Sequence, residues 1–196
     1  GIRWWAYGRV DTLLQYGEET WRRMRDSGLA MVFMGAETGS AEMLAQMNKG
    51  GLITPHKTLE VAARMKHYGI VPEMSFVLGN PPNPRADIET TLGFVRQLKQ
   101  TNADAEVILY LYSPVPLDGD LFEEALEAGF DFPQTLQEWI EADWEEFAQH
   151  RTSEVPWLTP ADKAYIKNFE RVLHAKYPTV TDPSLTGLKR KVLQAM

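Results

Sequence analysis

The sequence predicts an α/β fold, and three observations lead to that prediction. Short apolar runs alternate with amphipathic stretches through the first half of the 196 residues, which is the sequence form of repeated βα units around a parallel sheet. Hydrophobic residues make up 44% of the chain, which is enough to bury one sizeable core. Glycine and proline separate the runs, as they do between strands and helices.

The elements of the first half can be assigned in chain order. The predicted strands are Trp4–Tyr7, Ala30–Met34, Val71–Leu78 and Glu106–Tyr112. The predicted helices between them are Glu18–Asp26, Pro55–Tyr68 and Arg85–Lys99. The second helix has the clearest ends, because Thr54 can cap its start, Pro55 suits its first turn and Gly69 can end it. The repeat is roughly 35 residues, a typical length for such a unit.

Beyond Gly119 the pattern changes to helices without intervening strands. We predict helices at Asp120–Ala128, Leu136–Ala148 and Pro160–Lys176. Residues 1–126 therefore form the α/β part, and residues 127–196 form a helical carboxyl-terminal region. Within the middle helix, the spacing of Trp139, Trp144 and Phe147 indicates a core stripe and not a cofactor site.

Charge and composition exclude several classes of protein. The net charge of -7 is concentrated in residues 100–150, which carry 13 acidic residues and no lysine or arginine, so binding of a nucleic-acid backbone is disfavoured there. Cysteine is absent, which excludes a disulfide framework and any thiolate-bound metal or cluster within this chain. No apolar run reaches the roughly 20 residues of a membrane span, and we expect a cytoplasmic protein.

Three predicted strands end in residues that suit a ligand site, which parallel βα sheets place at the carboxyl ends of their strands. In the run from Gly35 to Ser40, Glu37 can accept hydrogen bonds from a ribose diol or an ammonium group, and Ser40 can cap the next helix. The second run joins Ser75 and Gly79 to a loop with three prolines, and the third surrounds Tyr112. A turn or cap without any ligand explains each run equally well when it is taken alone.

Taken together, these motifs carry a family resemblance. They occur in this order: Gly35-Ala36-Glu37-Thr38-Gly39-Ser40, Met47-Asn48-Lys49-Gly50, Phe76-Val77-Leu78-Gly79-Asn80-Pro81 and Pro114-Val115-Pro116. In order and spacing they resemble the later strands of the radical S-adenosylmethionine superfamily, in the branch whose members often carry a cobalamin-binding domain. The resemblance covers about Trp4–Leu126.

The resemblance implies a fold, a reaction and a set of contacts. The fold is the later part of a partial (β/α)6 barrel, similar to a TIM barrel, followed by the helical region. The parent protein is then an iron-sulfur oxidoreductase that cleaves S-adenosylmethionine to a 5'-deoxyadenosyl radical, with methyl transfer, optionally cobalamin-dependent, or cyclisation of a small hydrophobic substrate as the outcome. By position, the cofactor-binding residues are Glu37, Ser40, Lys49, Ser75, Gly79 and Tyr112.

The absence of cysteine indicates which part of such an enzyme this chain represents. A 4Fe-4S cluster is held by cysteine thiolates, and this sequence offers none. We therefore expect a fragment of a longer enzyme that lacks the Cys-x-x-x-Cys-x-x-Cys loop and is inactive alone; a barrel that has lost its cluster is the alternative. An unpaired edge of the partial barrel is then free to associate with another chain.

Two other functions remain open from the sequence. The first is a cluster-free barrel hydrolase or lyase in which Glu37 works with Asp11 or Glu73 as an acid/base pair. The second is a non-catalytic domain that binds a partner through the acidic helices between Asp118 and Glu146. In every case the carboxyl ends of the strands should meet, so we expect Glu37, Gly79 and Tyr112 at one edge of one parallel sheet.

Overall fold

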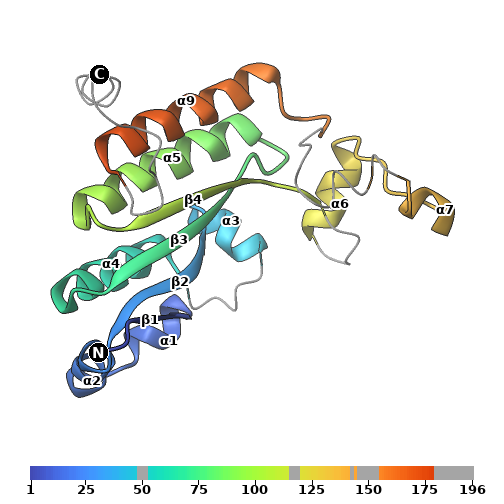
Figure 1. Cartoon of the computed structure of the whole chain (residues 1–196). Coiled ribbons are helices and arrows are strands. Elements are labelled where there is room, and N and C mark those ends of the chain that lie inside the picture. Colours follow the sequence, from blue (N-terminus) through green and yellow to red (C-terminus); the bar gives the residue numbers. More distant parts are fainter. Residues whose placement is uncertain (48–52, 115–119, 142–143, 145–154, 179–196) are drawn as a thin grey trace.

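Within the residues that the computed structural model describes, namely 1–47, 53–114, 120–141, 144 and 155–178, four parallel strands form one sheet. Their spatial order is the order of the sequence, β1–β2–β3–β4 (Figure 1). The strands are β1 (Trp4–Tyr7), β2 (Leu29–Glu37), β3 (Val71–Leu78) and β4 (Glu106–Leu111). The α/β class and all of the predicted strands are confirmed. β2 continues beyond Met34, because its pairing with β3 extends to Glu37.

The helices follow the predicted order with three differences. They are α1 (Val10–Leu14), α2 (Glu18–Asp26), α3 (Ala41–Gln46), α4 (Pro55–Tyr68), α5 (Pro84–Thr101), α6 (Asp120–Glu127), α7 (Leu136–Trp139) and α9 (Pro160–Lys176). α1 was not predicted, and α3 was expected only as a helix after Ser40, without bounds; both are too short to show a helical period. The continuous helix expected over Leu136–Ala148 is wrong, because α7 ends at Trp139 and the chain bends at Glu141. The parts of that prediction at 142–143 and 145–148 lie outside the described residues.

The ends of α4 show how local sequence fixes a helix. The side chain of Thr54 accepts a hydrogen bond from the backbone N–H of Lys57 at 3.2 Å, and Pro55 begins the first turn. Gly69 ends the helix in the left-handed conformation, at a φ of 67°, which a residue without a side chain adopts at little cost. The predicted start and end of this helix are both confirmed.

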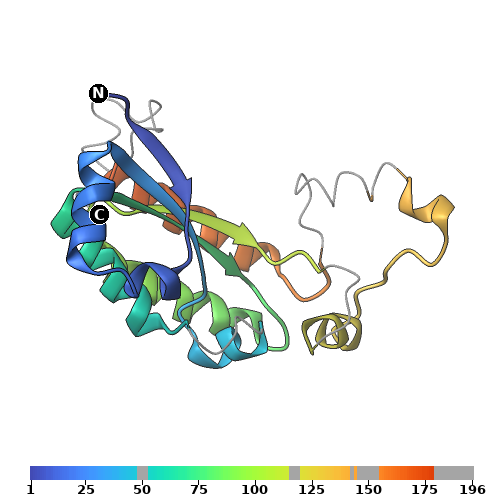
Figure 2. The ribbon, with the colours of Figure 1, turned by 90° about the horizontal axis from the view of Figure 1, so that it is seen from below.

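The order of the strands puts the helices that connect them on one face of the sheet. Connections between parallel strands are right-handed in nearly all proteins, and right-handed connections that always step in the same direction all pass over the same face. Figure 2 shows α2, α4 and α5 lying along one side of the strands. The side chains that point toward the helices form the main core and are almost completely buried, as in Val32, Met34, Met74 and Phe76.

The opposite face of the sheet, which we call the open face, carries the alternate residues of each strand. Aromatic rings are prominent there: Trp5, Tyr7 and Tyr110 expose 57%, 75% and 43% of their surface. Register places Trp5 opposite Met31 and Tyr7 opposite Phe33, so the rings continue from β1 onto β2. An exposed aromatic face on a parallel sheet is unusual, because such sheets are normally covered on both sides.

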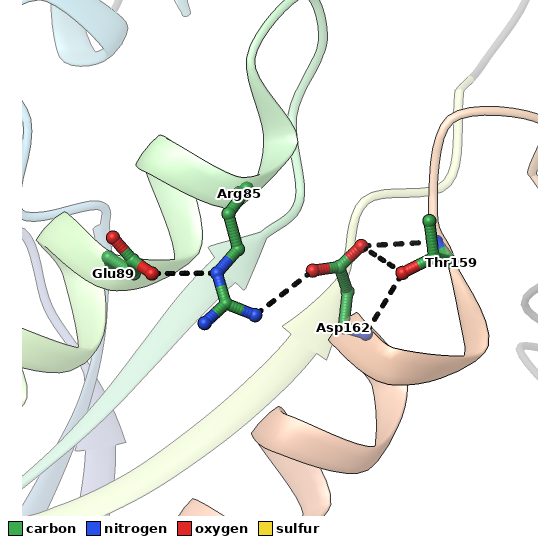
Figure 3. Close-up of polar contacts among 4 residues, drawn as sticks. All are labelled: Arg85, Glu89, Thr159 and Asp162. Atoms are coloured by element: carbon green, nitrogen blue, oxygen red, sulfur yellow. Dashed lines mark hydrogen bonds and ion pairs between the residues drawn. The ribbon is translucent and has the colours of Figure 1, made fainter.

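The carboxyl-terminal region packs against the first turns of α5. A second apolar cluster joins Leu78, Ile88 and Leu92 to Phe130, Phe132, Leu158 and Ile166. Figure 3 shows the polar part of this contact: Arg85 on α5 bonds to Glu89 at 2.7 Å and to Asp162 on α9 at 3.3 Å. The boundary at residue 126 stays a prediction.

No helix in the described part of the chain combines the length and the apolar character that crossing a membrane requires.

Candidate functional site

The carboxyl ends of β2, β3 and β4 meet at one edge of the sheet. Glu37 is the last residue of β2 and pairs with Phe76, and the backbone N–H of Tyr112 donates to the carbonyl of Leu78 at 2.8 Å. Gly79 follows Leu78 directly. The expectation that Glu37, Gly79 and Tyr112 share one edge of one parallel sheet is confirmed.

The backbone of Glu37 has an unusual conformation. Its φ is 64°, in the left-handed region that residues with side chains seldom occupy, and the pairing of β2 with β3 shifts register between Gly35 and Glu37. The Glu37 side chain folds back over Gly35, where it fills the space that a Cβ would take. Since Gly35 lies at an open-face position, the bulge brings the Glu37 carboxylate over that face.

Ser75 lies beside this carboxylate. It pairs with Gly35 across β2 and β3 and exposes 7% of its surface, and its hydroxyl makes no hydrogen bond to another described residue. A glycine and a serine opposite each other leave the sheet surface low between the larger side chains of Phe33 and Val77. Glu37 and Ser75 are therefore the two predicted site residues that the structure brings together on the open face.

Ser40 and Tyr112, two further predicted site residues, make hydrogen bonds within the protein. The Ser40 side chain caps α3 by accepting from the N–H of Met43 at 3.2 Å. The Tyr112 hydroxyl donates to the carbonyl of Leu121 at 3.1 Å, and burial, followed by the charge of Glu124, raises the pKa of Tyr112 to about 12. Lys49 lies outside the described residues. Their roles toward a ligand stay predictions.

Gly79 is surrounded by its own chain. Its φ is 79°, which explains why the position needs a glycine. The space on its Cβ side is filled by the methyl groups of Leu158, and its carbonyl accepts a hydrogen bond from the Trp157 indole at 2.9 Å. A planar group that approached Gly79 from that side would have to displace Leu158.

Sequence reasoning missed the buried carboxylate of Asp87, in the first turn of α5. One of its oxygens accepts from the backbone N–H of Gly79 at 2.8 Å, from the N–H of Asn80 at 3.1 Å and from the Asn80 side chain at 3.0 Å. Burial raises the pKa of Asp87, and the hydrogen bonds from Asn80, Gly79 and Thr38 oppose that rise. The only sequence signal was an acidic residue in the first turn of a helix, which ordinarily indicates a favourable interaction with the helix dipole.

A cavity of about 280 Å³ lies between α3 and the loop that follows β3. Its walls include Ser40, Met43, Asn80, Pro82 and Asp87. Asn80 is completely buried, and its side-chain oxygen has no hydrogen-bond partner within the described structure. A cavity of this size has room for an ordered water, which could donate a hydrogen bond to this buried oxygen.

The acid/base pair of the rival hydrolase or lyase has no support in the geometry. Glu73 pairs with Phe33, three positions before the residue that pairs with Glu37, which is about 10 Å along the strand. Burial, and then the neighbouring charge of Glu106, raises the pKa of Glu73. Asp11 forms an ion pair with Arg9 at 3.1 Å, which lowers the pKa of Asp11.

The residues of this chain do not fit an iron-sulfur cluster. The sequence contains no cysteine, and the described residues include no group of three histidine, aspartate or glutamate side chains placed to hold a metal ion. Thiolates are the usual ligands of a 4Fe-4S cluster, so a cluster would need cysteines from outside this sequence.

Comparison with known proteins gives one informative similarity. The chain is 31% identical over 97 residues to a protein of Pyrococcus horikoshii described as an uncharacterized methyltransferase. The matched stretch is 50% of this chain and 20% of that protein, so the match spans only about a fifth of the length of the relative. No family model matches the chain.

Proposed function

We propose that this chain is part of an S-adenosylmethionine-dependent methyltransferase of the radical S-adenosylmethionine type, and that it supplies the later βα units of its barrel. The observation that carries the proposal is the similarity to a protein described as a methyltransferase. S-adenosylmethionine is a common methyl donor, and the strand-end motifs from Gly35 to Pro81 resemble those of the radical enzymes that use it.

The strand order supports a barrel over the other common parallel arrangement. A doubly wound sheet reverses its strand order and carries helices on both faces, whereas a βα barrel keeps consecutive strands adjacent with the helices outside. This sheet has the second arrangement through all of its described strands. In the whole enzyme the open face, with its aromatic rings and Glu37, would then line the interior of the barrel.

Glu37 and Ser75 would make the principal polar contacts of this chain with the cofactor. The two oxygens of a carboxylate can each accept a hydrogen bond from one of the adjacent hydroxyls of a ribose, and the Ser75 hydroxyl can donate or accept beside it. The rings of Tyr7, Phe33 and Tyr110 would exclude water from the same space and form an apolar wall for a hydrophobic substrate. The roles proposed for Lys49, toward the methionyl carboxylate, and for Gly79, toward adenine, follow from the resemblance alone.

The cluster that would reduce S-adenosylmethionine belongs to the proposal only as a part of the longer protein. Because the residues of this chain do not fit it, we derive no step through it. Cobalamin is likewise an expectation from the resemblance. This chain's own contribution is to bind and orient the nucleoside at the carboxyl edge of the sheet.

The direct test is calorimetric titration of this chain with S-adenosylmethionine. Each hydrogen bond contributes only ~0.5 to 1.5 kcal/mol net, against an association cost of at least ~4 kcal/mol, so binding should be no tighter than the millimolar range. The longer protein with its cluster should bind far more tightly and lose affinity in Glu37→Ala. Glu19→Gln, an exposed carboxylate change on α2, is the matched control. Micromolar binding by this chain, or indifference of the longer protein to Glu37→Ala, contradicts the assignment.

A further inference from the structure

Two residues on one face of α5 contact both loops that form the candidate site. Asp87 and Thr91 are four residues apart in the helix, which places their side chains on the same side one turn from each other. Both are buried, with 7% and 0% of their surface exposed. This face of α5 is turned toward the ends of β2 and β3.

Asp87 holds the loop after β3, and Thr91 holds the loop after β2. The Asp87 carboxylate binds the N–H groups of Gly79 and Asn80, as described above. The Thr91 hydroxyl accepts from the backbone N–H of Gly39 at 3.2 Å and lies 2.9 Å from the Thr38 hydroxyl. Gly39 also packs so closely on α5 that a Cβ would overlap with Phe94 and would come within 3.1 Å of the Thr90 carbonyl.

Thr38 connects the two halves of this arrangement. Its hydroxyl lies between Thr91, at 2.9 Å, and the second carboxylate oxygen of Asp87, at 3.5 Å. The same hydroxyl accepts from the backbone N–H of Ser40 at 3.1 Å. The hydrogen bonds of the two loops thus form one buried network, and the bonds in such a network are energetically coupled.

We propose that Asp87 and Thr91 are positioning residues, which fix the loop after β2 and the loop after β3 relative to each other so that Glu37 and the loop after β3 can contact one nucleoside. Neither residue faces the open side of the sheet, so neither touches the ligand itself. Their importance for binding rests on the proposed function, whereas the coupling of the two loops does not.

A carboxylate is well suited to hold the loop after β3. Three N–H groups converge on one oxygen of Asp87, and an ionised oxygen accepts several charge-assisted bonds at once. Burial raises the pKa of Asp87, so keeping the group ionised at this place works against stability. A buried charge that costs stability and organises strand-end loops is characteristic of a functional site.

The test compares Thr91→Val, which keeps the shape of the side chain and loses its hydroxyl, with Thr91→Ser, which restores the hydroxyl. Thr101→Val on the last turn of the same helix is the control, because its hydroxyl bonds only within the helix, to the Gln97 carbonyl at 3.0 Å. The first readout is amide hydrogen exchange in this chain. Thr91→Val should speed amide exchange at least tenfold at Gly39 and also, through the network, at Gly79 and Asn80. Thr91→Ser should return the exchange rates in both loops to within about twofold of the wild-type rates. Thr101→Val should change the rates in neither loop.

The second readout is the chemical-shift change of the same amides on titration with S-adenosylmethionine. Thr91→Val should weaken binding at least fivefold, and Thr91→Ser should recover it. If Gly39 exchanges faster while Gly79 and Asn80 do not, the loops are held independently and the proposal is wrong. If both loops loosen and affinity is unchanged, the network does not position the site, and the proposal is again wrong.

The two proposals fail in different ways. If the wild-type chain gives no shift change with S-adenosylmethionine and the longer protein does not bind it either, the proposed function fails, and the exchange data still decide whether the loops are coupled. Should Thr91→Val not fold, Asp87→Asn gives the reciprocal measurement. Faster amide exchange at Gly79 and Asn80, in the loop after β3, must then be accompanied by at least tenfold faster exchange at Gly39 and Ser40, in the loop after β2.

Discussion

The two ends of α5 each bury a charged side chain, but the two charges have different surroundings. Each carries a buried charged side chain that is satisfied by backbone groups: Asp87 at the first turn binds N–H groups, and Lys99 at the last turn donates to the carbonyls of Ala103 and Ala105. Lys99 reaches only four and six residues along the chain, so it closes the turn into β4. Asp87 belongs to a network that also includes the loop after β2. One end completes a local turn, whereas the other joins parts of the chain that are distant in sequence.

The comparison teaches that burial of charge does not by itself mark a functional site. Both charges follow the helix dipole, with an acid at the start and a base at the end. What differs is the surroundings: the loops at the Asp87 end carry Glu37 in a left-handed conformation and open onto the aromatic face. The following variants test whether the two ends of α5 differ in the way that this geometry implies.

The largest effect is expected from Gly39→Ala. The new methyl group would overlap with Phe94 and press on the backbone carbonyl of Thr90, neither of which can move without shifting α5. We expect a loss of about 3 kcal/mol in the free energy of unfolding, measured by urea titration. Gly35→Ala is the matched control, because its methyl group meets only the tip of the Glu37 side chain, and it should cost less than ~1 kcal/mol. Equal losses would show that the loop after β2 is not tightly held on α5.

A smaller effect is expected at the other end of the helix, from the titration of Lys99. Burial lowers the pKa of Lys99 from 10.5 to about 8, while the charges of Glu106 and Asp104 oppose that change. Between these values the unfolded chain binds more protons than the folded chain, so stability must rise as the pH increases. Above pH 10 the raised pKa of Tyr112 acts in the opposite direction, since the unfolded tyrosine ionises first.

We therefore expect the free energy of unfolding to increase by about 1–2 kcal/mol between pH 8 and pH 10, and this increase to be absent in Lys99→Met. Urea titrations at pH 8, 9 and 10 measure it. A variant that keeps the wild-type slope would show that Lys99 is not the group responsible, and the two ends of α5 would then differ less than the structure indicates.

Trp157→Phe tests how strongly the carboxyl-terminal region is attached to the Asp87 end. The change keeps a ring beside Tyr112 and leaves the Gly79 carbonyl without the indole N–H. Loss of one such hydrogen bond should lower stability by about 1 kcal/mol. It should also speed amide exchange at Leu158, whose N–H bonds to the Val155 carbonyl. Unchanged stability and exchange would mean that apolar packing alone holds this segment.

The smallest effect is expected from Glu37→Gly, and its sign is the informative part. Glycine adopts the observed φ of 64° without the steric cost of a side chain, which offsets the greater entropy of the unfolded glycine. Glu37→Gly should be more stable than Glu37→Gln, by at most ~1 kcal/mol, because both variants lose the carboxylate and only the glutamine keeps the backbone cost. A Glu37→Gly protein that is less stable than Glu37→Gln would show that the left-handed conformation carries no such cost.

Local sequence signals were sufficient for most of the elements. Thr54, Pro55 and Gly69 marked both ends of α4, and continuous apolar runs marked β3 and β4. These signals act within a few residues, so they can be read without knowing the fold. The same reasoning failed after Trp139, where a helical period continued in the sequence although the chain bends at Glu141.

The candidate site was predictable only in part. That Glu37, Gly79 and Tyr112 would share an edge followed from the rule that parallel strands end on the same side. The direction of the Glu37 side chain did not follow, because it depends on a bulge that forms only when β2 pairs with β3. Gly79 was predicted from the resemblance to contact the cofactor, but the structure fills the space on its Cβ side with Leu158, from 79 residues further along the chain.

The sequence by itself determined the α/β class, the order of the strands and of the long helices α2, α4 and α5 between them, and the absence of any thiolate ligand in this chain. Tertiary structure alone decided the joining of the two strand-end loops by Asp87 and Thr91, and the exposure of one aromatic face of the sheet. The physical reason is the range of the interactions. Helix caps and apolar periods act over a few neighbouring residues, whereas Thr38 and Thr91 meet across 53 residues only after α5 has packed on the sheet.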